Sequence, residues 1–291
     1  MTHFDFSPPA IAALAHADVA RALKEDVGSG DLTAALIDPK RRARARIVVR
    51  EAAVLCGSAW AAAAVLALDP SAVLTWHIQE GERTVAGQVV LEIEGQAQAL
   101  LTAERTALNF LQLLSAVATQ THVFVQAVGN VPGNRAAIVD TRKTIPGLRL
   151  AQKYAVRTGG GTNHRIGLYD AVLIKENHIA AAGGVQAALE QAQTATVAKG
   201  ATFIEIEVET LVQLEEALQA GARMVLLDNM DVATLRQAVA MNARRAVLEV
   251  SGGVNLSTVR EIAATGVDRI SIGALTKDVR AVDFSMRFEE L

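Results

Sequence analysis

Hydrophobic and polar positions divide the chain into two regions with different patterns. In the first region an amphipathic helix is predicted over residues 10–24. Strand-like runs follow at residues 45–51, 72–78 and 88–95, with an Ala-rich helix between the first two runs. These runs predict a small antiparallel sheet that carries helices. A long helical pattern then runs from residue 102 to residue 128 and links the two regions.

The second region repeats a short apolar strand that ends in a polar or charged residue. Its six strands read AAIVDTRK, AVLIKEN, FIEIEVE, MVLLDN, AVLEVSGG and RISIGAL. The last four recur about every 22 residues, which is the period of a β-α unit. Consecutive β-α units predict an α/β barrel, with its site at the carboxyl ends of the strands. A doubly wound sheet is the alternative fold, but no GxGxxG motif follows a first strand.

Composition and charge exclude several classes of protein. A hydrophobic content of 51% with 20% charged residues indicates a folded chain. A formal charge of -3 and an isoelectric point near 6.1 give no general attraction to nucleic acid or anionic membranes. The N-terminus lacks the pattern of a signal peptide, and the longest apolar run, residues 59–68, is too short to span a bilayer. With a single cysteine, the sequence predicts a soluble cytoplasmic protein with no nucleic-acid or membrane partner.

Basic side chains gather in one stretch, residues 140–178, of this acidic chain. The cations there are Arg142, Lys143, Arg149, Lys153, Arg157, Arg165 and Lys175. Because apolar runs bracket the stretch, we expect these cations at strand ends around one pocket, which suits a small polyanion. A second charged run, residues 40–50, is predicted to be a solvated strand at a sheet edge.

Lys175 ends an otherwise apolar strand, so it is predicted to be largely buried and to need anionic partners. The alternative is a structural ion pair with Glu207 or Asp228. Glu205, Glu207 and Glu209 alternate with apolar residues and therefore project to one face of their strand. Glu207 and Asp228 could order Mg²⁺ through water, bind ribose hydroxyls or stabilise a developing cation, and the sequence does not choose among these roles.

Small residues end the last two strands. Ser251, Gly252 and Gly253 end one, and the run from Ser271 to Ala274 ends the other. Small residues at the last strands of a barrel let backbone N–H groups approach a phosphate closely. As a pair, the two motifs indicate a phosphate site.

Eight blocks along the chain resemble one family. EDVGSGDLT, ERTALNFLQLLS, DTRKTIPGLR, GGGTNHRIGLYDAVLIKENH, EIEVET, LLDNM, EVSGG and SIGALT, in this order, closely resemble quinolinate phosphoribosyltransferase, also called nicotinate-nucleotide diphosphorylase (carboxylating). The resemblance covers nearly the whole chain, and the TRKT and HRxGLxDxxLIKENH blocks are highly specific. It implies that quinolinate and 5-phosphoribosyl diphosphate give nicotinate mononucleotide, diphosphate and CO₂ in de novo NAD biosynthesis.

The resemblance also implies an N-terminal α/β sandwich domain and a C-terminal incomplete (β/α) TIM-like barrel. We expect these at residues 1–114 and 115–275, with the tail, residues 276–291, packed back on the first domain. Mg²⁺ dependence is implied, as is a homodimer with a shared active site, or a higher oligomer built from such dimers.

Roles are carried over residue by residue. Arg105 would reach the partner subunit's site, and Thr141 would lie in the binding site. Arg142, His164, Arg165 and Lys175 would surround the quinolinate carboxylates. The expected catalytic residues are Lys143, Lys175, Glu207 and Asp228, the last two also addressing the metal. Backbone groups of Ser251, Gly252, Gly253, Ile272, Gly273 and Ala274 would hold the 5-phosphate.

Three other functions remain open at this stage. Lys175 could be a Schiff-base nucleophile, as in barrel aldolases, although this leaves the surrounding arginines unexplained. The chain could be a paralogue that uses the same scaffold on another base. A non-catalytic binding protein would bind the ligand without releasing diphosphate.

Overall fold

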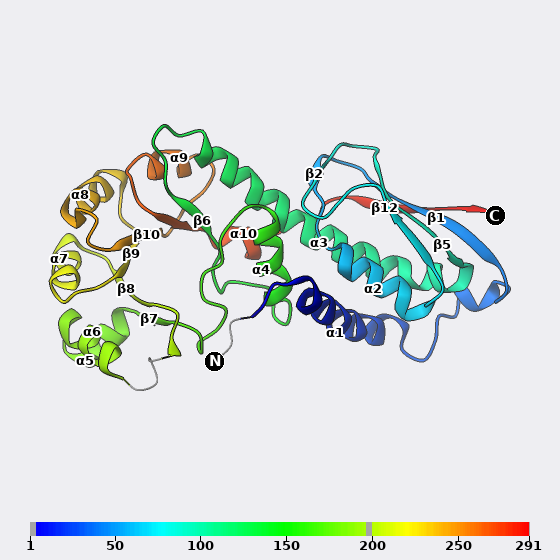
Figure 1. The fold of residues 1–291 in the computed structure, drawn as a ribbon, viewed down its shortest axis with the longest axis horizontal. Helices are drawn as coiled ribbons and strands as arrows, with labels where there is room; N and C mark the ends of the chain where they lie inside the picture. The colour runs from blue at the N-terminus through cyan, green and yellow to red at the C-terminus, as the bar shows by residue number, and fades with distance from the viewer. Residues whose placement is uncertain (1–3, 196–199, 291) are drawn as a thin grey trace. The chain divides into compact units, whose positions relative to one another are not determined.

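The computed structural model describes residues 4–195 and 200–290, and the chain divides into two compact units. One unit contains residues 5–122, 145–160 and 278–291, and we call it the sandwich unit. The other contains residues 1–4, 123–144 and 161–277, and we call it the barrel unit. Figure 1 shows the ribbon of both units with the elements labelled. The fold is mixed α/β, with separate antiparallel and parallel sheets.

The sandwich unit is built on a four-stranded antiparallel sheet in the order β12-β1-β5-β3. Its strands are β1 (Arg42–Val49), β3 (Val73–Trp76), β5 (Val89–Gln96) and β12 (Phe284–Glu290). The sequence RARARIVV in β1 alternates, so that Ala43, Ala45, Ile47 and Val49 are buried while the arginines lie on the other face. The antiparallel sheet predicted from the sequence is therefore present.

The prediction that the charged run forms a sheet edge is wrong. β1 is an inner strand, because β12 from the end of the chain pairs with it from Ala43 to Val49. Its arginines are matched by acids on the neighbouring strands: Arg46 lies 2.8 Å from Glu92 and 2.8 Å from Glu289. Arg44 pairs with Glu94.

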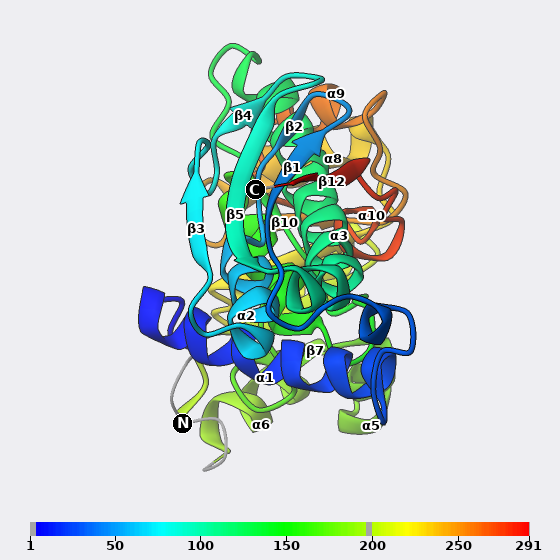
Figure 2. The same cartoon turned by 90° about the vertical axis from the view of Figure 1, so that its right-hand side faces the viewer.

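The sandwich unit also contains helices. They are α1 (Pro8–Val27), α2 (Ser58–Leu68), α4 (Arg149–Thr158) and the first part of α3 (Ala97–Gly129), with a 3-10 turn η1 (Ala34–Leu36) and a small two-stranded sheet of β2 (Ala53–Val54) and β4 (Arg83–Thr84). In both views α2 lies between the sheet and α1 (Figures 1 and 2). Trp60 of α2 is fully buried, and its Nε1–H donates to the buried Asp18 of α1 at 2.9 Å.

The sequence analysis missed α4, and this omission changes the cation cluster. Arg149, Lys153 and Arg157 lie on α4, in the sandwich unit, and not at barrel strand ends. The segment is helical because Ala151, Gln152, Ala155 and Val156 form one buried face at helical spacing. The prediction that all seven cations surround one pocket is thus wrong for these three.

The barrel unit contains a six-stranded, fully parallel sheet in the order β6-β11-β10-β9-β8-β7. Its strands are β6 (Ala137–Val139), β7 (Val172–Ile174), β8 (Ile204–Val208), β9 (Met224–Asp228), β10 (Val247–Ser251) and β11 (Arg269–Ser271). All six match strands predicted from the sequence. Within the described residues β6 and β7 are the two edges, so the sheet is an incomplete TIM-like barrel and not a doubly wound sheet.

Helices alternate with the later strands, as in β-α units. They are α5 (Glu176–Ala182), α6 (Val185–Thr194), α7 (Leu211–Gln219), α8 (Val232–Asn242), α9 (Val259–Ala263) and α10 (Ala274–Lys277). The 33-residue helix α3 belongs to both units, which divide after His122 inside it. The expected domain boundary at residue 114 stays a prediction. No helix in the described part of the chain is long and apolar enough to cross a bilayer.

Candidate active site

The carboxyl ends of the barrel strands surround a cavity of about 600 Å³. Its lining combines cations, acids and small residues: Thr141, Arg142, Lys143, His164, Arg165, Leu173, Lys175, Glu207, Leu226, Asp228, Asn229, Glu249, Ser251, Gly252, Gly253 and Ser271. Most of the side chains selected from the sequence therefore share one cavity. This is the end of the sheet at which α/β barrels carry their sites.

The loop after β6 supplies Thr141, Arg142 and Lys143. Lys143 donates its backbone N–H to Oγ1 of Thr141 (3.0 Å), and its carbonyl accepts from Oγ1 of Thr276 (2.7 Å). The buried Nε of Arg142 has no hydrogen-bond partner in the described part of the protein. A buried guanidinium nitrogen without a partner favours an anionic ligand at this place.

Lys175 lies directly after β7 and pairs with Glu207 of β8. The prediction that Lys175 is largely buried is wrong, because its side chain is 43% exposed while that of Glu207 is 11% exposed. Lys175 is the residue before α5, and its backbone N–H donates to Nδ1 of His178 at 3.0 Å. Lys175 therefore lies just beyond the carboxyl end of β7, and it lines the cavity. The ion pair between Lys175 and Glu207 is one of the two structural ion pairs that the sequence analysis gave as an alternative.

Asp228 ends β9 on the same cavity. Burial raises its pKa, and the positive charges of Lys175 and Lys143 partly offset that effect. Asn229 donates from Nδ2 to Oδ2 of Asp228 at 2.7 Å. Glu207 and Asp228 present hard oxygen ligands of the kind that hold Mg²⁺, and a cation would favour the charged form of Asp228. These two residues therefore fit the implied metal.

A buried cluster adjoins the cavity and joins His164, which the sequence analysis placed in the site, to Glu205, Glu249 and Arg269, which it did not. Nε2 of His164 is 2.9 Å from Oε2 of Glu205 and 3.5 Å from Oε1 of Glu249. Nε of Arg269 donates to Oε2 of Glu249 at 2.6 Å. Both glutamates are fully buried. The missed signal was the alternation within AVLEVSGG and RISIGAL, which places Glu249 and Arg269 on the inward face of adjacent strands.

Burial dominates the electrostatics of this cluster. It raises the pKa of Glu205 to about 7, against the opposing effects of Arg269 and Arg165. Burial also raises the pKa of Glu249, and the charge of Glu205 adds to that rise. The ligand atoms of His164, Glu205 and Glu249 lie within 4.8 Å of one another, as metal ligands do. His164 and Arg269 bind these carboxylates, so the cluster contains its own counter-charges.

The loop after β10 requires its glycine. Gly252 has φ +98°, and a Cβ added there would lie 2.1 Å from Oδ1 of Asn229. Ser251, Gly252 and Gly253 all line the cavity. Close approach of backbone N–H groups to an anion is possible here because no side chain intervenes.

Four residues selected from the sequence are not in the cavity lining. Ile272 is 1% exposed, and Ala274 begins α10. A Cβ added to Gly273 would lie 3.1 Å from Cδ of Lys143, so this glycine makes room for the lysine. Arg105 lies on α3 in the sandwich unit, where it is exposed.

Two family models match the chain in succession. The N-terminal domain of quinolinate phosphoribosyl transferase matches residues 31–115, and the C-terminal domain matches residues 117–287. The chain belongs to the quinolinate phosphoribosyltransferase family. The residues that line the barrel cavity all lie within the region of the C-terminal match.

Relatives and solved structures agree with this membership. The chain is 41% identical over 262 residues to a probable nicotinate-nucleotide pyrophosphorylase [carboxylating] of Bacillus subtilis, with 90% of this chain and 89% of that protein covered. It is 41% identical to the Mycobacterium leprae nicotinate-nucleotide pyrophosphorylase [carboxylating], with 92% and 95% covered. The nicotinate-nucleotide pyrophosphorylase structure from Francisella tularensis matches with a TM-score of 0.92 and 39% identity, with 99% of this chain and 100% of that chain covered.

Proposed function

We propose that this chain transfers the phosphoribosyl group of 5-phosphoribosyl diphosphate to quinolinate, with loss of CO₂, to give nicotinate mononucleotide and diphosphate. It is a decarboxylating pentosyltransferase of NAD biosynthesis, the activity for which its relatives are named. The observation that carries the assignment is one cavity that combines four cations, three acids and a glycine loop. We further propose that it acts in the cytoplasm.

Quinolinate carries two carboxylates, and the cavity offers cations that suit them. Arg142 and Arg165 provide planar guanidinium groups, and Lys175 provides a point charge. Burial and the neighbouring charge of Arg142 lower the pKa of Arg165. Two adjacent guanidinium groups repel each other, so a dianion between them relieves an unfavourable contact. This arrangement selects a dicarboxylate over a monocarboxylate such as nicotinate.

Transfer requires the ring nitrogen of quinolinate to form a bond to the anomeric carbon while the bond to diphosphate breaks. Positive charge develops on the ribose as diphosphate leaves, so positioning and electrostatics dominate the barrier. The carboxylates of Glu207 and Asp228 stabilise that charge, and Lys143 neutralises the leaving group. Mg²⁺, held by Glu207 and Asp228, would supply additional positive charge to the diphosphate oxygens. Backbone N–H groups of residues 251–253 hold the 5-phosphate.

Decarboxylation follows from the alkylated ring. The bond between C2 and its carboxylate breaks, CO₂ leaves, and the electron pair stays at C2 beside the positively charged nitrogen until a proton adds. The ring is therefore its own electron sink, and no Schiff base at Lys175 is needed. The ion pair between Lys175 and Glu207 sets the position of the lysine along the cavity wall.

A homodimer with a shared site is part of the proposal. Arg105 is exposed on α3 and absent from the cavity lining of its own chain, which suits a residue that serves the partner subunit. Mixed dimers of Arg105→Ala and Lys175→Ala subunits test this. We expect them to regain activity that neither variant has alone, because one of the two sites then receives both wild-type residues. A mixed dimer as inactive as its parents would refute the shared site.

Turnover tests the function itself. The protein is incubated with quinolinate, 5-phosphoribosyl diphosphate and Mg²⁺, and nicotinate mononucleotide and CO₂ are followed together. Equal amounts of both products from quinolinate, with little product from nicotinate, are expected. Folded protein that turns over another base instead, or binds without releasing diphosphate, would overturn the assignment.

A further inference from the structure

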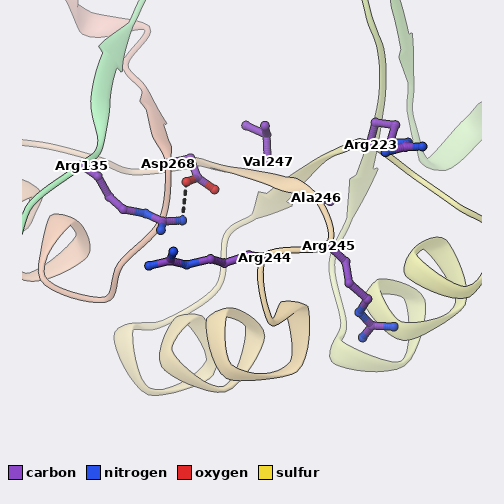
Figure 3. Close-up of a pocket in the computed structure, with 7 residues that line it drawn as sticks. All are labelled: Arg135, Arg223, Arg244, Arg245, Ala246, Val247 and Asp268. Carbon is purple, nitrogen blue, oxygen red and sulfur yellow. Dashed lines mark hydrogen bonds and ion pairs between the residues drawn. The ribbon is translucent and has the colours of Figure 1, made fainter.

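A second charged hollow lies at the opposite ends of the barrel strands. It has a volume of about 480 Å³ and is lined by Arg135, Arg223, Arg244, Arg245, Ala246, Val247 and Asp268 (Figure 3). Arg223 directly precedes β9, Val247 begins β10, and Asp268 directly precedes β11. The hollow is thus formed by the amino ends of the strands, and we call it the arginine hollow. None of its residues lines the catalytic cavity.

The positive charge of the arginine hollow is only partly neutralised. Arg135 pairs with Asp268 at 2.5 Å, and Arg245 lies 3.1 Å from Glu215. Arg223 and Arg244 form no hydrogen bond or ion pair through their side chains within the described part of the chain. Two uncompensated guanidinium groups in a protein of net charge -3 form a local attraction for an anion.

The side chains of this hollow have distinct orientations. Figure 3 shows the side chains of Arg135 and Arg244 extending toward each other near Asp268, with Arg223 at the far end of the hollow and Arg245 pointing away. Arg245 is occupied elsewhere, because it also donates to the carbonyl of Met241 at 2.8 Å. Arg135 and Arg244 therefore form one cationic end and Arg223 the other. Arginine presents a planar fork that matches phosphate oxygens.

The turn that carries Arg244 is rigid and strained. Ala243 and Arg244 have φ +43° and +64°, a left-handed conformation that favours glycine. The buried side chain of Asn242 ties the turn to Ala246, accepting from its N–H at 2.9 Å and donating to its carbonyl at 2.8 Å. A strained residue that the surroundings hold in place is more often functional than accidental. The strain here fixes where the Arg244 side chain leaves the backbone.

An adjoining hollow of about 450 Å³ shares Arg135, Arg244 and Asp268 with the first. Its remaining wall includes the apolar side chains Val239, Ala240 and Leu248. Arg135 and Arg244 therefore lie where the two hollows meet. The arginine hollow extends from them to Arg223, and the adjoining hollow is more apolar. A ligand that fills both needs phosphates at one end and an uncharged group at the other.

We propose that the arginine hollow binds an organic phosphate of nucleotide type, separately from the catalytic cavity. The phosphate nearest the uncharged group lies between Arg135 and Arg244, and a second phosphate reaches toward Arg223. The base or sugar lies against Val239 and Ala240. Asp268, already paired with Arg135, keeps that guanidinium in place. This site does not depend on the proposed transferase activity.

Calorimetric titration of the full-length protein with ADP tests this site, with inorganic diphosphate as the second probe. We expect ADP to bind wild type more tightly than diphosphate does. Arg244→Ala and Arg223→Ala should each weaken ADP binding by about tenfold. The matched control is Arg236→Ala, an exposed arginine of α8 outside both hollows, and it should leave ADP affinity unchanged.

Arg244→Gly separates a ligand role from a structural one. Glycine accepts the left-handed backbone without strain, so this variant should melt at a higher temperature while losing ADP affinity. The KM for 5-phosphoribosyl diphosphate should stay at the wild-type value. The proposal is overturned if wild type binds no ADP at millimolar concentration. It is also overturned if Arg244→Ala weakens ADP binding no more than Arg236→Ala does, or if ADP binding survives Arg244→Gly but is lost in Arg142→Ala.

Discussion

The Nε2 atom of His164 lies 2.9 Å from Oε2 of Glu205, while its Nδ1 accepts the backbone N–H of Arg165 at 2.8 Å. Because Nδ1 is an acceptor, the ring proton sits on Nε2 and is donated to Glu205. Both ring nitrogens are thus used within the protein. These two hydrogen bonds fix the orientation of the His164 ring in the lining of the catalytic cavity.

Replacing Glu205 by Gln should change how stability depends on pH. Burial raises the pKa of Glu205 from an ordinary value of 4.5 to about 7, so the folded protein holds this proton more tightly than the unfolded chain. The corresponding stabilisation is complete below pH 4.5 and is lost as the pH rises to about 7. Between pH 4.5 and about 7, the unfolding free energy of wild type should therefore fall by up to roughly 3 kcal/mol more than that of Glu205→Gln.

Urea unfolding at a series of pH values measures this difference. Glu190→Gln, at an exposed position on α6, is the control and should follow the wild-type curve. If the stability of Glu205→Gln falls as steeply as that of wild type between these pH values, the raised pKa of Glu205 is contradicted.

Removal of the Arg142 guanidinium should weaken quinolinate binding. Its buried Nε has no partner in the described structure, so a substrate carboxylate is the group expected to satisfy it. Loss of a charge-assisted hydrogen bond costs about 1.5–3 kcal/mol, which corresponds to an increase in the quinolinate KM of roughly 10–100-fold. Steady-state kinetics of Arg142→Ala measure this, with Arg236→Ala as a control. An unchanged KM would remove Arg142 from the carboxylate site.

The pair of Lys175 and Glu207 should matter for activity more than for stability. Lys175 is 43% exposed, so breaking the pair should cost less than about 1 kcal/mol of unfolding free energy. Lys175→Met should nevertheless lower turnover by roughly 100-fold or more, because it removes a preorganised charge from the cavity. A double-mutant cycle with Glu207→Gln, read by urea unfolding and by single-turnover rates, measures both effects. Large destabilisation with retained turnover would mean that the pair is structural.

Asp18 should stabilise the sandwich unit without affecting the chemistry. Asp18→Ala leaves the buried Nε1–H of Trp60 without its acceptor, at a cost of about 1–3 kcal/mol. Trp60→Phe in the Asp18→Ala background removes the unsatisfied donor, so the two losses should not add. Urea unfolding and turnover at low temperature check this. Strict additivity of the two losses, or a changed quinolinate KM, would contradict it.

The barrel strands could be predicted from the sequence because each is a short apolar run that ends in a polar residue. Their carboxyl ends converge in any barrel, so Arg142, Lys175 and Asp228 could be placed together without coordinates. The exposure of the Lys175 side chain could not be predicted from the sequence. The apolar run before it suggests burial, but the strand ends at Ile174 and the lysine is already the cap of the next helix.

Residues 149–158 show a second limit of sequence reasoning. Density of charge suggested a common pocket, although helical spacing of small buried residues was present in the same segment. Glu249 and Arg269 were missed because a single charge inside an apolar strand gives no sign of its partner. Only the pairing of β10 with β11 brings the two together, and pairing between strands is not encoded locally.

The last strand of the chain, β12, completes the sheet begun by β1. During synthesis the first strands are made long before residues 284–290, so β1 is an edge strand until those residues are made. The flank of β1 then exposes unpaired backbone N–H and C=O groups, the feature through which sheets of different molecules associate. Translation that stops short of β12 would leave the nascent chain prone to aggregation, even with every residue of the catalytic cavity already made.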